Sequence, residues 1–104
     1  MIIAITSFAL SKPITPEEAR IIFRSTAPTY QGVKGLLRKH YILSEDGLTA
    51  GGVYLWNSKA EAEAMYTDAW RAFVRQKYDT EPGVTYFASP VTVDNVAGQI
   101  IADE

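Results

Sequence analysis

The chain has 104 residues, no cysteine and a formal net charge of −2. This length suits a single domain, 1–104, and the lack of cysteine excludes disulfides, thiolate metal sites and a cysteine nucleophile. The negative charge argues against a general affinity for nucleic acid, because phosphates are bound by clustered Lys and Arg. We therefore expect one cytoplasmic domain that does not bind nucleic acid.

Apolar, mostly β-branched residues open the chain and predict a first strand over Ile2–Phe8. No basic stretch precedes them, and the polar residues Lys12 and Pro13 follow too soon for a signal peptide. No run approaches the roughly 18 apolar residues that a membrane span needs. We therefore expect no membrane-bound segment.

A helix is predicted to begin at Thr15. Thr15 and Glu18 have the spacing of a capping box, in which each side chain bonds the backbone N–H of the other residue. Pro16 would occupy the first helical position, where its missing donor is not needed. The residue before a proline avoids the helical region, so Pro28 should end this helix soon after Thr26.

Two β-rich runs, Leu36–Leu43 and Thr49–Trp56, flank the turn-forming residues 45–47 and predict a β-hairpin. Ser58 and Glu61 then form a second potential capping box, which begins a second helix. The apolar face of that helix rotates along the chain, and we expect a kink or a restart near Thr67.

The last predicted strand runs over Val84–Val93, where Pro90 implies an edge position or a bulge. The element order is then β-α-β-β-α-β. With right-handed crossovers it folds as an α+β ferredoxin-like sandwich, a four-stranded antiparallel sheet with both helices on one face.

The other face of that sheet has no cover within the chain. The runs Ile2–Ile5 and Val53–Trp56 are nevertheless apolar on both faces. An exposed apolar face needs a partner, and two-fold self-association is the commonest solution. We therefore predict a homodimer that joins through its sheets into an α/β barrel.

Several stretches have a familiar pattern, namely Gly35–Tyr41, Ser44–Gly47, Ala50–Trp56 and Glu81–Phe87, with Pro90 and Val93–Asn95 after them. Together they resemble the small mono-oxygenase family of the dimeric α/β-barrel superfamily, from Glu17 to about Asn95. The resemblance implies a ferredoxin-like barrel and points to oxidation without a cofactor. It carries over no catalytic residue.

The residues themselves favour few kinds of site. One histidine and scattered carboxylates predict no metal site, and Gly51-Gly52 precedes a strand, unlike a phosphate-binding loop. Oxidation without a cofactor requires a substrate that supplies electrons itself, such as a phenol or quinol. The protein would contribute a base or a hydrogen-bond donor for the oxyanion, together with aromatic walls.

His40 is the candidate catalytic base, because its unperturbed pKa suits proton transfer near neutrality. Arg38 shares strand parity with His40, so both side chains should lie on one face, where Arg38 could bind a substrate anion. The alternative is that His40 is an ordinary strand residue or lies at the dimer interface.

The other predicted substrate-binding residues are aromatic: Tyr54, Trp56, Tyr66, Trp70 and Tyr86. Gly52 shares a strand face with the first two and leaves space beside them. The alternative for all five is ordinary core packing, or, for Tyr54 and Trp56, packing at the dimer interface.

Two further functions use the same elements. The chain could be a non-catalytic module that binds a small hydrophobic ligand or only stabilises a dimer. RNA-recognition motifs share the element order and carry aromatic residues on the third strand, but their basic-glycine-aromatic pattern is missing here. A small aromatic ligand and a second copy are thus the expected partners.

Overall fold

The computed structural model describes residues 1–103. These residues form nine elements, in the order β1 (Ile2–Ala9), α1 (Pro16–Tyr30), β2 (Leu36–Leu43), β3 (Thr49–Trp56), α2 (Lys59–Met65), α3 (Asp68–Tyr78), β4 (Gly83–Ala88), β5 (Val91–Asp94) and β6 (Gln99–Ala102).

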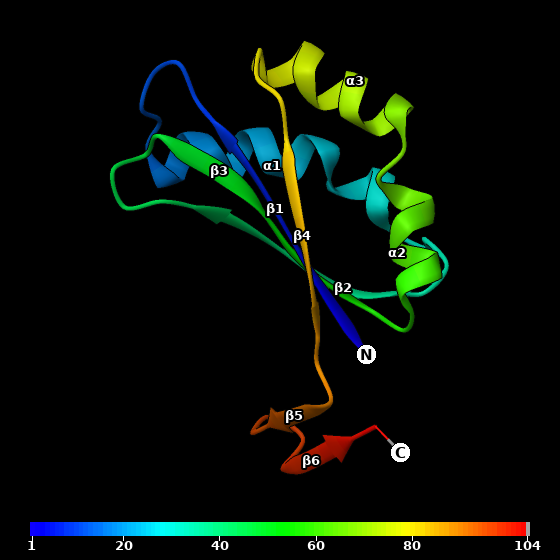
Figure 1. Ribbon diagram of the computed structural model, residues 1–104. Helices are drawn as coiled ribbons and strands as arrows, with labels where there is room; N and C mark the ends of the chain where they lie inside the picture. The colour runs from blue at the N-terminus through cyan, green and yellow to red at the C-terminus, as the bar shows by residue number, and fades with distance from the viewer. Residues whose placement is uncertain (104) are drawn as a thin grey trace.

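The main sheet has the strand order β2-β3-β1-β4, and all its neighbouring strands are antiparallel. The three helices lie on one face of this sheet and leave the other face open (Figure 1). The predicted α+β ferredoxin-like arrangement is confirmed. None of the helices in residues 1–103 is long and apolar enough to cross a membrane.

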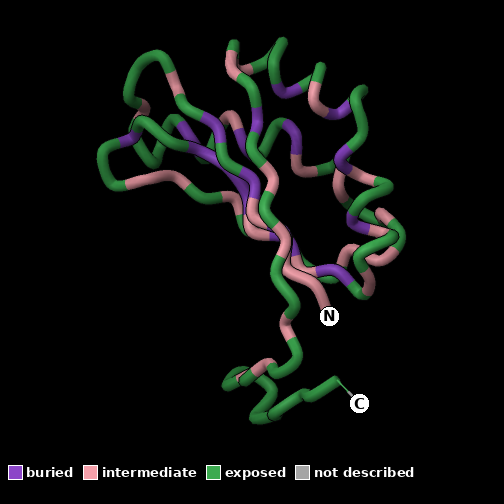
Figure 2. The backbone as a smooth tube through the Cα atoms, viewed as in Figure 1, coloured by how far each residue is buried: buried purple, intermediate pink, exposed green. Residues whose placement is uncertain are grey.

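The core lies between the helices and the sheet, where buried segments of both layers face each other (Figure 2). Successive side chains of a strand point to opposite faces, so every second residue of the two central strands is buried beneath the helices. These residues are Ala4, Thr6, Phe8, Ala50, Gly52, Tyr54 and Trp56.

Helix α1 begins as predicted and ends later than predicted. Thr15 and Glu18 form the complete capping box, with N···O distances of 3.0 and 3.1 Å. The expected stop at Pro28 is wrong, because the helix continues through Tyr30. In the last turn the missing proline N–H removes only one hydrogen bond, and the Pro28 carbonyl still accepts one from the Gln31 N–H.

The predicted restart of the second helix is confirmed. Helix α2 ends at Met65, and α3 begins after Thr67, whose side chain accepts a hydrogen bond from the Trp70 N–H at 3.3 Å. Ser58 caps α2 by accepting from the Glu61 N–H, while the Glu61 carboxylate binds the Ser58 hydroxyl rather than returning to the backbone.

The prediction of one strand over Val84–Val93 is wrong. Strand β4 ends at Ala88, and β5 and β6 form a separate two-stranded sheet. Pro90 has no N–H to continue the ladder, while its carbonyl accepts from the Asp103 N–H at 2.8 Å. This C-terminal hairpin, residues 91–102, lies apart from the body of the molecule (Figure 1).

Strand β2 contains a bulge that sets which side chains face the helices. Leu36 pairs with Trp56 and Arg38 pairs with Leu55. Leu37 therefore has no partner residue on β3 and forms the bulge. Downstream of the bulge, Lys39 pairs with Tyr54 and therefore faces the helices.

Candidate functional site

The predicted site residues lie on two opposite faces of the sheet. Arg38 and His40 are exposed on the open face, where their strand partners are Leu55 and Val53. The five aromatic residues lie on the side covered by the helices. The structure therefore brings His40 together with Arg38, and separates both from the aromatic group.

The aromatic residues form one connected cluster. Tyr54 and Trp56 are only 1% and 0% exposed, and Tyr66 packs edge-on against Tyr54 with ring centroids 5.3 Å apart. Trp56 Nε1 donates to the Tyr66 hydroxyl at 3.1 Å. The rings of Trp70 and Tyr86 also pack edge-on against the Tyr66 ring.

This burial bears on the RNA-binding alternative, which depended on Tyr54 and Trp56 being presented on an open sheet. Both rings are beneath the helices, so they cannot stack on nucleotide bases.

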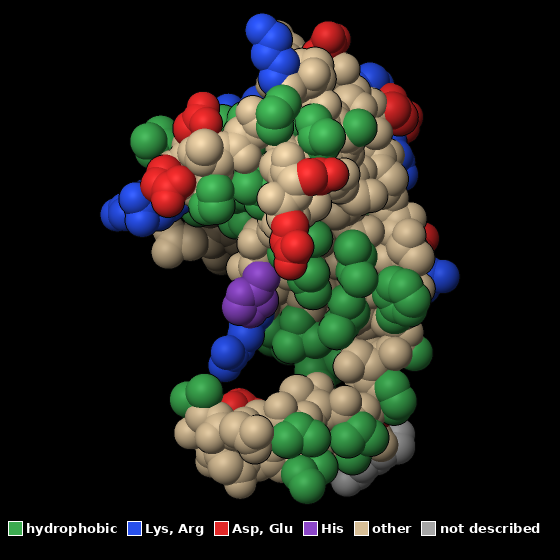
Figure 3. All heavy atoms as spheres, turned by 90° about the vertical axis from the view of Figure 1, so that its left-hand side faces the viewer, with side chains coloured by type: hydrophobic (Ala, Val, Ile, Leu, Met, Phe, Trp, Pro, Cys, Tyr) green, Lys and Arg blue, Asp and Glu red, His purple; other side chains and the backbone are tan. Residues whose placement is uncertain are grey.

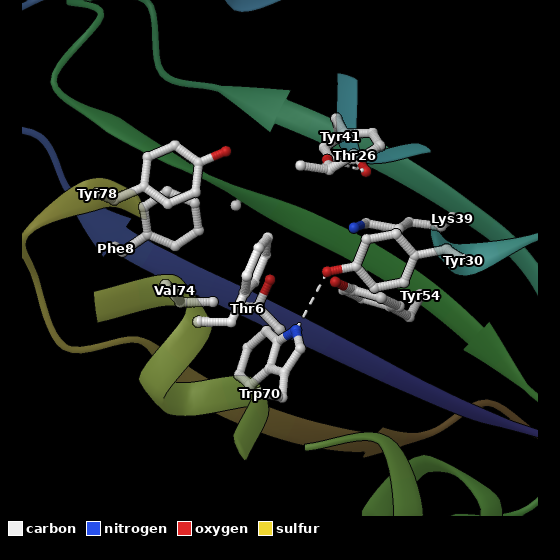
Figure 4. Close-up of a pocket in the computed structure, with 12 residues that line it drawn as sticks. Thr6, Phe8, Thr26, Tyr30, Lys39, Tyr41, Tyr54, Trp70, Val74 and Tyr78 are labelled. Carbon is white, nitrogen blue, oxygen red and sulfur yellow. Dashed lines mark hydrogen bonds between the residues drawn. The ribbon is translucent and has the colours of Figure 1, made fainter. Parts of the chain in front are cut away.

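Lys39 lies on the helix-covered side of the edge strand β2 and was not predicted as a site residue. Its ammonium nitrogen lies over three tyrosine rings, 3.3 Å from the centroid of Tyr30, 3.8 Å from that of Tyr41 and 4.7 Å from that of Tyr54. We call Lys39 and these three tyrosines the tyrosine cage (Figure 4). Within residues 1–103, no carboxylate forms an ion pair with Lys39.

Gly52 makes room for the tyrosine cage. A Cβ atom at this position would lie 2.8 Å from the Tyr54 ring and 3.2 Å from the Lys39 side chain. The space that the sequence predicts beside Tyr54 is therefore occupied by the stem of Lys39.

Hydrogen bonds fix the rings of the cage. Trp70 Nε1 donates to the Tyr30 hydroxyl at 3.1 Å (Figure 4). Thr26 donates to the Phe23 carbonyl, so the 2.7 Å contact between Thr26 and Tyr41 has the Tyr41 hydroxyl as donor. Two of the three rings that face Lys39 are thus held by partners outside the cage.

Burial changes the proton affinity of the cage. It lowers the pKa of Lys39 to about 7, because desolvation disfavours the ammonium form. Burial raises the pKa of the Tyr54 hydroxyl far above its usual value, and raises the pKa of Tyr41 as well. Near neutrality the amine can therefore accept a proton, while these hydroxyls remain protonated.

The tyrosine cage separates a small closed cavity from an open groove. The cavity has a volume of about 20 Å³, which suits one or two water molecules, and Thr6 and Trp70 are among its lining residues. The groove has a volume of about 320 Å³ and lies between the end of α1 and β2, with Ala27 and Gly32 on its wall. Tyr30, Lys39 and Tyr41 line both spaces.

A second hollow lies on the open face of the sheet. It measures about 370 Å³ and is lined by His40 and Arg38 on the sheet and by Val91 and Val93 on the C-terminal hairpin. In the space-filling view, hydrophobic side chains gather above a gap that divides the body from the hairpin (Figure 3).

A sequence signal for Lys39 does exist. Lys39 has the same strand parity as Tyr41 and Leu43, which are apolar enough to indicate the covered face. Tyr30 carried no such signal, because the helix was expected to end before it.

Comparisons with known proteins rest on structure. No family model and no curated protein matches the chain by sequence. The fold is similar to a monooxygenase from the gene ActVA-Orf6 of Streptomyces coelicolor, solved in complex with Nanaomycin D, with a TM-score of 0.64 and 18% identity over 85% of this chain and 86% of that one.

Two further structures are similar to the same extent. SnoaB, a cofactor-independent oxygenase from Streptomyces nogalater, has a TM-score of 0.62 and 14% identity over 88% of this chain and 95% of that one. An antibiotic biosynthesis monooxygenase has a TM-score of 0.59 and 14% identity over 86% and 98% of the two chains. The chain thus has a ferredoxin-like fold similar to that of these monooxygenases.

Proposed function

We propose that this protein is a mono-oxygenase that oxidises a small phenol or quinol without a cofactor, and that the substrate binds in the groove beside the tyrosine cage. One observation carries the proposal: the groove of about 320 Å³ opens onto a buried amine surrounded by tyrosine rings. Aromatic walls with a single polar group suit a flat, weakly acidic ligand. The fold shared with a cofactor-independent oxygenase supports this function.

The reaction uses dioxygen as the oxidant and the substrate as the source of electrons. The ionised substrate gives one electron to dioxygen, and the two radicals combine to form a carbon-bound peroxide. The peroxide carbon then loses its C–H proton as the O–O bond breaks, so one oxygen atom remains as a carbonyl. The other oxygen atom leaves as water, which takes up this proton and the hydroxyl proton of the substrate. A ring C–H is thereby oxidised to a quinone carbonyl, with both electron pairs coming from the substrate.

The test is oxygen uptake by the purified protein with a chelator present, against naphthols, anthrones and hydroquinones. We expect saturable uptake that the Ala27→Trp substitution abolishes, because the indole fills the groove. Ala72→Trp is the matched control, since Ala72 is exposed on α3, away from the groove residues. His40→Ala examines the open-face hollow, and we expect it to leave the uptake unchanged.

Uptake that survives Ala27→Trp but falls in His40→Ala would place the chemistry in the open-face hollow and contradict the groove. Absence of uptake with every substrate would contradict oxidation of these compounds. In that case a second function gains weight, namely binding of a small hydrophobic ligand without turnover. The groove of about 320 Å³ would serve that alternative as well, because binding without turnover needs the same aromatic walls.

We also propose that the protein is a homodimer that covers the open face of the sheet. Ile3, Val53 and Leu55 are only half-buried there, and Phe87 is 50% exposed. The C-terminal hairpin adds exposed apolar residues along the same side. A second copy placed on this face would enclose the hollow that contains His40.

A further inference from the structure

We propose that the Lys39 amine is the group that accepts the hydroxyl proton of the bound substrate. This inference rests on the proposed function, because it assigns a catalytic role within the same groove. The position of the amine carries it: Lys39 lines both the groove and the closed cavity, and its nitrogen faces three ring surfaces.

No other group that faces this position is a comparable base. The titratable groups around the amine are tyrosines, Tyr30 from α1, Tyr41 from β2 and Tyr54 from β3, while Tyr78 at the end of α3 lines the closed cavity. Burial raises the pKa of Tyr41, of Tyr54 and of Tyr78, so these phenols remain protonated and act as donors.

The remaining charged residue that lines the groove is Arg38, whose side chain lies on the open face of the sheet with that of His40. Its guanidinium therefore lies on the opposite side of the sheet from the Lys39 amine. Lys39 lines the groove from the helix-covered side, and burial lowers its pKa to about 7, so its amine can take the proton near neutrality.

The cage suits both states of the amine. In the transfer, the substrate O–H bond breaks and an N–H bond forms on Nζ, so phenol and amine become phenolate and ammonium. The electron-rich faces of the three tyrosines attract the new cation, which offsets part of the desolvation that the charge incurs. The cage thereby keeps the phenolate and the ammonium close together.

The first experiment monitors the ionisation of a bound chromophore, meta-nitrophenol, by its visible absorption. It is done without turnover, at a pH at which the free phenol is protonated and the Lys39 amine is largely uncharged. We expect the wild-type protein to produce the phenolate band on binding, without release of a proton to the buffer. Lys39→Met, which keeps an unbranched side chain, should bind the phenol with at least about tenfold less phenolate formed.

Lys59→Met is the matched control, because the Lys59 amine also lies over a tyrosine ring, 5.5 Å from that of Tyr86, but belongs to an exposed residue. It should behave like the wild type. Lys39→Arg separates acceptance of the proton from attraction of the anion. Any phenolate that forms in this variant must release one proton to the buffer, because a guanidinium cannot accept it.

A phenolate band of equal strength in wild type and Lys39→Met would overturn the role of Lys39 and leave the proposed function standing. Failure of the wild type to bind any phenol would contradict both.

A second measurement applies to the wild type alone and requires no variant to fold. Competitive acetylation followed by mass spectrometry should show the Lys39 amine titrating near pH 7, well below the exposed lysines. Titration together with the exposed lysines would overturn the inference, whatever the protein binds.

Discussion

Lys39 is a partly buried lysine, and desolvation by burial disfavours the charged ammonium form of its side chain. In the unfolded chain its amine keeps a proton up to about pH 10. In the folded chain it does so only up to about pH 7. Between these values the unfolded state binds more protons, so the contribution of Lys39 to the free energy of unfolding rises with pH.

We therefore predict that wild type gains stability relative to Lys39→Met between about pH 7 and about pH 10, by a few kcal/mol. The high pKa values of the buried tyrosines affect both proteins alike and cancel in the difference. Urea denaturation at a series of pH values measures this difference. Lys59→Met should show a constant difference from the wild type, and a constant difference for Lys39→Met as well would refute the expected titration.

The starts of α1 and α2 could be predicted from the local sequence. Their capping residues indicate where each helix begins, because a cap accepts hydrogen bonds from backbone donors within three residues. Pro28 led to a wrong prediction of the helix end, because the energetic cost of a proline depends on its position in the helix. In the last turn a proline removes only one backbone hydrogen bond. Tyr30 lies in the last turn of α1, beyond the predicted end of the helix, and was therefore not among the predicted site residues.

At the scale of elements, we predict that Thr67→Ala loosens the first turn of α3. The Thr67 hydroxyl is the acceptor for the Trp70 N–H, so its loss should lower the free energy of unfolding by about 1 kcal/mol. Hydrogen exchange should accelerate at the start of α3. Thr80→Ala, in the turn after this helix, is the control, and unchanged exchange in Thr67→Ala would show that the cap is not needed for the restart.

Features that depend on contacts between distant parts of the chain could not be predicted from the local sequence pattern. Strand parity paired Arg38 with His40 correctly, but which face they share depends on what covers the sheet, and that is decided by the whole fold. The C-terminal hairpin was missed because β6 has only four residues, all exposed, and so no buried face marks it in the sequence. The aromatic cluster was predicted as a group, whereas the Lys39 amine, which contacts that cluster at Tyr54, was not.

For the whole molecule, we predict a dimer of twice the 11.5 kDa chain mass by light scattering. Phe87→Asp should shift it to monomer, because it places a charge on the apolar open face. Ile21→Asp is the matched control, since Ile21 is 72% exposed on α1, outside the open face. A monomeric wild type at micromolar concentration would exclude the dimer.

The bulge at Leu37 and the tight turn before β3 have a consequence for how this site can evolve. Three consecutive residues, Arg38, Lys39 and His40, carry basic nitrogen, and only the middle one faces the tyrosines. A deletion of one residue between Lys39 and the turn would shift the preceding part of β2 by one position. Each side chain there would move to the opposite face of the sheet, and the residue before Lys39 would face the tyrosines. Loss of a single codon would then exchange the amine for the guanidinium of Arg38, so strand length selects the group that faces the tyrosines as strictly as residue identity does.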